Sequence, residues 1–333
     1  MYDEPISETK EDIFMKKFKY YKSNKPKPSL RAVISIEKSS VEIANITPSE
    51  VIGDVRTEAL GLKSCKEWQC YSFKTHPGLI FISNPFTNLG QRYWIRKCLE
   101  EYPRKPNKLN IDVDINIDDW WQTCYKDGQC NRQLQKKLRW TTLGYHHNWD
   151  TKVYTELNQS RFPEDLAELS DVVAQYLGYN SFKAEAAIVN YYHMSSTLSA
   201  HTDHSEVNLE APLFSFSFGQ SAIFMIGGQT KTVEPSALLL NSGDIVVMSK
   251  EARLCYHAVP RILPSTKHPW NDHNFRIPYE IPTFKYINDP KYLMTSMAEN
   301  TDNSKWSKFD NYIKESRINM NVRQVLKENQ KSL

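Results

Sequence analysis

Three residues of the sequence have the types and spacing of a metal site. His201-Thr202-Asp203 places an imidazole and a carboxylate two positions apart, and residues i and i+2 of a β-strand share one face. His257, in the apolar segment 254–260, is the best third ligand. Two histidines and one carboxylate form the facial triad of non-haem Fe(II) oxygenases, which leaves coordination positions open. The HxD spacing alone is weak evidence, and a zinc hydrolase could use the same three residues.

A segment near the C-terminus strengthens this interpretation. From Arg317 to Arg323 the odd positions are polar and the even positions apolar, as expected of a β-strand with one polar face. Its two guanidinium groups can bind carboxylates through bidentate hydrogen bonds, so the face suits a small acid with two carboxylates. Asn190 and Tyr192 share another strand face upstream of HxD. Ordinary strand packing with a solvated polar face is the alternative for both segments.

The hydrophobic pattern predicts which elements position these residues. Apolar residues at i+3 and i+4 predict a helix from about 85 that ends at Pro103, and a second helix from Pro163 to Gly178. The period then changes to 2, which predicts strands over 184–192, 213–218, 221–226, 230–233, 236–240, 245–248 and 317–325. Short strands punctuated by turns favour a sandwich or barrel such as a jelly roll. Residues 264–310 are rich in Pro, Asn and Lys and predict a long excursion between strands.

Composition excludes several classes of protein. The 333 residues carry a net charge of +3, and the length allows one large domain or two. The six cysteines form no CxxC pair, which is typical of reduced intracellular thiols. We find no apolar run of membrane-spanning length and no secretory leader in the sequence, and predict no membrane association. Residues 13–36 hold seven bases, no acid and interleaved aromatics, which indicates either a docked helix with a solvated tail or a polyanion-binding arm.

In combination, these motifs resemble the AlkB family of Fe(II)/2-oxoglutarate-dependent dioxygenases. The resemblance runs from about Phe73 to Gln324 and is densest over 143–150, 190–192, 213–219, 242–245, 257–261 and 317–326. It implies an α+β fold, namely a double-stranded β-helix (jelly roll, cupin-like) with an N-terminal helical extension and a nucleotide-recognition lid. The corresponding domains are a basic N-terminal extension (1–36), helical support and lid (37–180), and the dioxygenase core (181–328).

The resemblance also implies roles for individual residues. His201, Asp203 and His257 would bind iron, which makes Asp203 a catalytic residue as well. Arg317 would bind the distal carboxylate of 2-oxoglutarate and Arg323 would lie near its keto-acid end, with three hydrogen-bonding partners: Asn190, Tyr192 and Asn319. The substrate-binding candidates on the lid side are Trp121, Trp140, Tyr145, His146, His147 and Tyr154. Two residues depart from the family pattern: Asn321 stands where Thr is common, and His147 where Tyr is expected.

The implied activity is oxidative demethylation of methylated bases with Fe(II), 2-oxoglutarate and O2, yielding succinate, CO2 and, from N-methyl groups, formaldehyde. The expected substrates are N6-methyladenine in unpaired or bulged DNA, and N1-methyladenine or 5-methylcytosine in tRNA. A monomer in the nucleus or mitochondrion is expected. Two alternatives stay open: an oxygenase of the same fold acting on protein side chains such as histone methyl-lysine, and a non-enzymatic cupin-like binding module.

Overall fold

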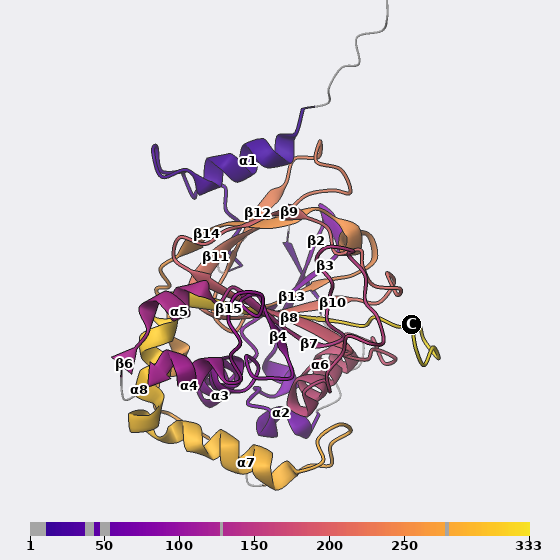
Figure 1. Cartoon of the computed structure of the whole chain (residues 1–333). Coiled ribbons are helices and arrows are strands. Elements are labelled where there is room, and N and C mark those ends of the chain that lie inside the picture. Colours follow the sequence, from indigo (N-terminus) through magenta and orange to yellow (C-terminus); the bar gives the residue numbers. More distant parts are fainter. Residues whose placement is uncertain (1–10, 37–42, 47–53, 127–128, 277–279) are drawn as a thin grey trace, which may run out of the picture.

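Two antiparallel β-sheets lie at the centre of the structure (Figure 1), a computed structural model that describes residues 11–36, 43–46, 54–126, 129–276 and 280–333. The larger sheet has the strand order β1 (Ile43–Ile46), β2 (Gln69–Phe73), β3 (His76–Ser83), β13 (Ile245–Met248), β10 (Leu213–Gly219), β15 (Ser316–Arg323), β8 (Ala186–His193), β7 (Trp140–Gly144) and β4 (Lys108–Leu109). The smaller sheet has the order β12 (Ser236–Leu240), β11 (Ser221–Ile226), β14 (His257–Leu263) and β9 (Leu198–His201). Apolar side chains of both sheets pack in one cluster.

This arrangement confirms the predicted α+β class and is consistent with a double-stranded β-helix. The helices are α1 (Ile13–Lys22), α2 (Arg56–Ala59), α3 (Asn88–Glu100), α4 (Trp120–Cys124), α5 (Arg132–Lys137), α6 (Glu164–Tyr176), α7 (Pro290–Ala298) and α8 (Asn303–Ile313), and a hairpin pairs β5 (Tyr125–Lys126) with β6 (Gln129–Cys130). Within the described part of the chain we find no helix with the length and apolarity that a bilayer crossing requires.

Strand β10 shows how the sequence pattern separates the two faces of the large sheet. Phe214, Phe216 and Phe218 belong to the cluster that also contains the buried faces of α3 and α6, so the helices cover this face of the sheet. Ser215 and Ser217 alternate with these rings and therefore face the smaller sheet. Because β10 pairs with β15, the apolar even positions of β15 join the same helical cluster. The polar odd positions of β15 consequently face the interior between the sheets.

Most predicted elements are confirmed, and one prediction needs correction. The helices predicted before Pro103 and after Pro163 are α3 and α6, and Gly178 follows α6 with a φ of 84°. The strand predicted over 230–233 is wrong, because that segment forms a turn between β11 and β12 in which the carbonyl of Lys231 accepts a hydrogen bond from the Phe14 backbone. The predicted excursion 264–310 does lie between strands, β14 and β15. It contains α7 and most of α8, which its polar composition did not indicate.

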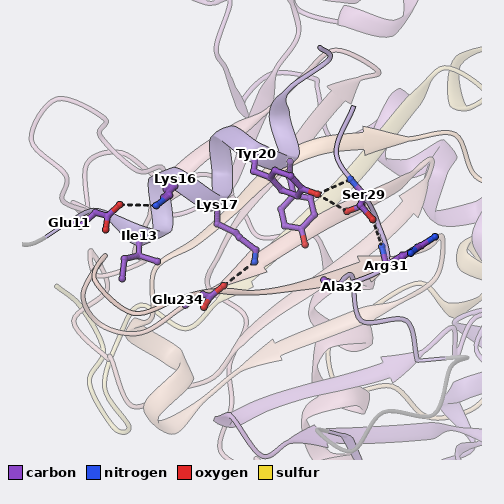
Figure 2. Close-up of a pocket in the computed structure, with 10 residues that line it drawn as sticks. Glu11, Ile13, Lys16, Lys17, Tyr20, Ser29, Arg31, Ala32 and Glu234 are labelled. Carbon is purple, nitrogen blue, oxygen red and sulfur yellow. Dashed lines mark hydrogen bonds and ion pairs between the residues drawn. The ribbon is translucent and has the colours of Figure 1, made fainter. Parts of the chain in front are cut away.

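The basic N-terminal segment begins with the docked helix α1, while residues 1–10 of the predicted extension lie outside the described residues. Phe14, Phe18 and Tyr21 pack on the outer face of β11 and β14, which supports the first of the two interpretations of this segment. Two of its bases are neutralised beside a hollow (Figure 2): Lys17 pairs with Glu234 at 2.9 Å and Lys16 with Glu11 at 3.1 Å. Arg261 of β14 donates hydrogen bonds to carbonyls at the C-terminal end of α1.

Helix α3 is anchored at its first turn by a close contact between two glycines. The Thr87 hydroxyl accepts a hydrogen bond from the Gly90 amide and donates one to the carbonyl of Gly61. A Cβ added to Gly90 would lie 1.9 Å from that carbonyl oxygen and 2.7 Å from the Gly61 Cα. The sequence therefore needs a residue without a side chain at this position.

We expect Gly90→Ala to lower the free energy of unfolding by about 3 kcal/mol or more, because overpacking against backbone cannot be relieved by a rotamer change. Gly178→Ala is the matched control: its added Cβ meets no atom within 4 Å, so only the left-handed backbone conformation is penalised, by about 1–2 kcal/mol. Urea unfolding of both variants checks this order. Equal losses would show that the Gly61–Gly90 contact can relax.

Candidate metal and cosubstrate site

The three predicted metal ligands converge where β9 ends and β14 begins. His201 is the last residue of β9 and is paired in register with His257, the first residue of β14. Their ring centroids lie 4.2 Å apart. Asp203 lies in the loop after β9, so the expectation that strand geometry aligns it with His201 is wrong. The potential ligand atoms of the three residues nevertheless all lie within 4.8 Å of one another.

Backbone carbonyls orient both imidazoles. The Nδ1 of His201 lies 2.9 Å from the carbonyl oxygen of Ser199, and that of His257 lies 3.1 Å from the carbonyl of Cys255. Because a carbonyl can only accept, each Nδ1 carries the proton and each Nε2 keeps its lone pair for a metal. Burial, aided by the adjacent His257, lowers the pKa of His201 to about 4. His201 is therefore a neutral ligand at physiological pH.

The third ligand is a charged carboxylate held by two arginines. Oδ1 of Asp203 accepts a hydrogen bond from Arg323 at 3.0 Å, and its backbone carbonyl accepts one from Arg253 at 2.6 Å. Burial would raise the pKa of Asp203, but the Arg323 guanidinium holds it well below its usual value. Two imidazoles and one carboxylate, with the remaining positions open, form the donor set that Fe(II) oxygenases use. The residues present therefore fit Fe(II).

The cosubstrate candidates lie on neighbouring strands of the large sheet and share its inner face. Arg317 is paired with Tyr192, and Asn319 with Asn190, across β15 and β8. The cavity between the sheets is lined by Tyr192, Arg317 and Asn319 together with His257. Asn321, which replaces the threonine common in the family, lines it too. The polar face predicted for β15 thus opens onto the metal ligands.

Arg317 is a buried cation that can bind an anionic ligand. The side chain is 1% exposed. Within the described part of the chain its guanidinium donates only to neutral groups, the Ser217 hydroxyl at 2.7 Å and the Gln220 backbone carbonyl at 3.2 Å. Its Nε is buried and has no hydrogen-bond partner among the described residues. Burial lowers the pKa of Arg317 to about 10, so the group stays protonated at neutral pH. A carboxylate entering the cavity would satisfy this cation.

Part of the predicted substrate side forms an aromatic cluster beside the metal ligands. His147 packs edge-on against Trp149 at 4.7 Å and Tyr154 at 5.4 Å, and Trp149 lies 5.1 Å from Trp140. Nε2 of His147 lies 3.0 Å from the Ser205 hydroxyl, two residues after Asp203. We call Trp140, His147, Trp149 and Tyr154 the aromatic cluster.

Three other substrate candidates do not join the aromatic cluster. Trp121 is 1% exposed and stacks on Phe309 of α8 within the helical core. His146 is buried against the Thr142 hydroxyl, and burial lowers its pKa to about 4. Tyr145 donates its hydroxyl to Glu156. Their side chains are used to hold the surrounding elements together.

Several residues of the site were not predicted from the sequence. Ser217 and Ser215 contact Arg317 and Asn319, and the polar positions of the alternating segment 213–218 could have indicated them. Arg253 and Glu206 form a buried ion pair at 2.9 Å next to Asp203. No sequence motif indicates Arg253, because it lies in a short 3₁₀ turn, Lys250–Leu254, that follows β13.

A facial triad of potential metal ligands thus lies between two antiparallel sheets, next to a buried arginine whose guanidinium donates to neutral groups. Residues 78–323 match the 2OG-Fe(II) oxygenase superfamily. The chain is 37% identical over 96% of its length to the nucleic acid dioxygenase ALKBH1 of Homo sapiens, covering 85% of that protein. It is 33% identical over 83% of its length to the tRNA demethylase abh1 of Schizosaccharomyces pombe, covering 89%. The chain therefore belongs to the AlkB family of 2OG-Fe(II) oxygenases.

Among solved structures, that of OsALKBH1 aligns with 75% of this chain and 97% of its own, at a TM-score of 0.45 and 19% identity. Family and triad together make the protein a dioxygenase with Fe(II) as cofactor and 2-oxoglutarate as cosubstrate. Bound by His201, Asp203 and His257, the iron supplies the oxidising chemistry.

Arg317→Met should raise the KM for 2-oxoglutarate at least about tenfold, because a hydrogen bond to a charged group contributes about 1.5–3 kcal/mol. Arg317→Lys keeps the charge without the planar fork and should give an intermediate KM. Succinate formation at varied 2-oxoglutarate concentration measures both. Arg92→Met is the control, since Arg92 is equally buried but donates to the Trp270 and Asn300 carbonyls. An unchanged KM in Arg317→Met would remove this residue from the cosubstrate site.

Proposed function

We propose that this dioxygenase demethylates bases of nucleic acids, with N-methylated adenine as its main substrate. The aromatic cluster next to Asp203 is the observation that carries the proposal. A base can stack on such rings in any sequence context, because every base has a π-face. The names of the two relatives described above agree with a nucleic-acid substrate. The name of a third, the DNA N(6)-methyladenine demethylase ALKBH1A of Arabidopsis thaliana, 29% identical over 77% of this chain, agrees with methylated adenine.

A row of paired residues connects the aromatic cluster with the cosubstrate face. Trp140 is opposite Asn190 across β7 and β8, Asn190 is opposite Asn319 of β15, and Asn319 is opposite Ser217 of β10. Directly opposed residues in an antiparallel sheet point to the same side. A base stacked near Trp140 would therefore lie over the same face of the sheet as the cosubstrate residues.

The rest of the aromatic cluster would complete the nucleotide-recognition lid. Trp149 is 48% exposed and can stack on an unpaired base, while the His147–Ser205 pair offers hydrogen bonds to a base edge. A base within a duplex cannot reach a recessed site without leaving the stack. Single-stranded, bulged or stem-loop substrates, such as unpaired DNA or a tRNA loop, therefore suit this site best.

Basic residues next to the aromatic cluster would hold the phosphate backbone. Lys136 and Lys137 are exposed in the last turn of α5, and Arg139 precedes Trp140. The carbonyl of Arg139 accepts a hydrogen bond from the Tyr191 amide of β8, which fixes this segment to the sheet that carries the site. Contacts to phosphates position a nucleic acid without selecting its sequence.

Turnover on a panel of substrates tests the proposal. The panel contains N6-methyladenine in single-stranded and bulged DNA, N1-methyladenine and 5-methylcytosine in tRNA stem-loops, and a methyl-lysine histone peptide. With Fe(II) and 2-oxoglutarate we expect N-methyl groups to be lost from nucleic acid in air and retained anaerobically, with one formaldehyde and one succinate per methyl group. Mass spectrometry measures both products. Turnover of the peptide alone would favour the protein-directed alternative.

His201→Ala is the control for this panel. It should abolish methyl loss, because it removes one of the metal ligands, while oligonucleotide binding stays within about twofold of wild type. Demethylation at the wild-type rate would contradict the assignment of the triad.

Trp149→Ala should weaken binding of a methylated single-stranded oligonucleotide about 5- to 150-fold, since stacking on an aromatic side chain contributes about 1–3 kcal/mol per base. Tyr292→Ala is the matched control, because Tyr292 is an exposed ring, 58% accessible, on α7. Fluorescence anisotropy with inactive Mn(II)-loaded protein measures both affinities. Equal affinity of the two variants would exclude Trp149 from the nucleotide site.

A further inference from the structure

Glu206 is a buried carboxylate that lies next to the metal ligands but is not one of them. Its side chain is inaccessible to solvent. One oxygen accepts a hydrogen bond from Arg253 at 2.9 Å, and the other accepts hydrogen bonds from Arg323 and from the Tyr154 hydroxyl, both at 3.1 Å. Glu206 therefore joins the two arginines that also bind Asp203.

The charges of this group balance without any ligand. Arg253 and Arg323 are cations, and Asp203 and Glu206 are anions. Arg323 is shared between the two carboxylates, at 3.0 Å from Asp203 and 3.1 Å from Glu206. A guanidinium paired with Asp203 alone would compete with a metal cation for that carboxylate, and an uncompensated positive charge nearby would repel the cation.

Glu206 also fixes the backbone that presents Asp203. Through Arg253 it is connected to the carbonyl of Asp203 at 2.6 Å and to the carbonyl of Ala211 at 3.0 Å. These two carbonyls lie at the two ends of the loop between β9 and β10. The Glu206 carboxylate also contacts Tyr154 of the aromatic cluster. One side chain therefore connects the loop after β9, Arg323 and the substrate side.

We propose that Glu206 is a positioning residue for the metal centre: its charge offsets Arg323, which leaves Asp203 available to a divalent cation. The role goes beyond the proposed function, because it concerns the cation and holds for any substrate. Groups of this kind around metal ligands typically change metal affinity 10- to 100-fold when they are altered.

Titration of the full-length protein with Mn(II), followed by calorimetry, tests the role without turnover. Glu206→Gln keeps the size of the side chain and removes its charge, and it should raise the Kd for Mn(II) about 10- to 100-fold. Glu206→Asp keeps the charge and should stay within a few-fold of wild type. Wild-type affinity in Glu206→Gln, or an equal loss in both variants, would overturn the proposal.

A control variant, and a variant that removes a positive charge instead of a negative one, complete the test. Glu168→Gln removes another inaccessible carboxylate that is paired with an arginine, Arg56, but on α6, and it should leave the Mn(II) affinity unchanged even if the protein loses stability. Arg323→Gln removes the competing cation, and it should bind Mn(II) at least as tightly as wild type while its affinity for 2-oxoglutarate falls. Weaker Mn(II) binding in Arg323→Gln would contradict the proposal, and this comparison decides the question if Glu206→Gln fails to fold.

Discussion

The polar face of β15, buried between two sheets, is the constraint on which the rest of the structure depends. A buried guanidinium is costly unless most of its donors find acceptors. Arg317 obtains neutral acceptors from β10, and Arg323 obtains carboxylates from the loop after β9. The hydrogen bonds of Arg317 therefore go to neutral groups, whereas Arg323 is already paired with Asp203 and Glu206. One strand thus carries two buried cations in different electrostatic surroundings.

Each of the two sheets carries a different part of the site. The small sheet brings His201 and His257 together through a single register pair, and the large sheet carries the cosubstrate face and Trp140. Helices α3 and α6 cover the other face of the large sheet, where the phenylalanines of β10 are buried. The active site therefore lies between walls whose outer faces are already packed, which keeps its geometry rigid.

The parts of the fold and of the site that could be predicted from the sequence are those marked by a pattern within one segment. The period-2 alternation identified β10 and β15, and the apolar stripes identified α3 and α6, because one buried face leaves a clear signature in each. The triad was found from spacing, although Asp203 reaches it from a loop. Arg253, Glu206 and the burial of Trp121 depend on contacts between distant segments, and single residues carry no trace of such contacts. Polar composition concealed α7 and α8, whose packing residues are few.

The row of opposed residues from Trp140 to Asn319 fixes the distance between these two positions along the sheet. Neighbouring strands are spaced about 4.8 Å apart, and two such steps separate Trp140 from Asn319. The backbones at Trp140 and Asn319 are thereby held about 10 Å apart. Under the proposed function, a base stacked against Trp140 would be selected by how far its methyl group projects toward the cosubstrate face. The same base methylated on another edge would then not be turned over.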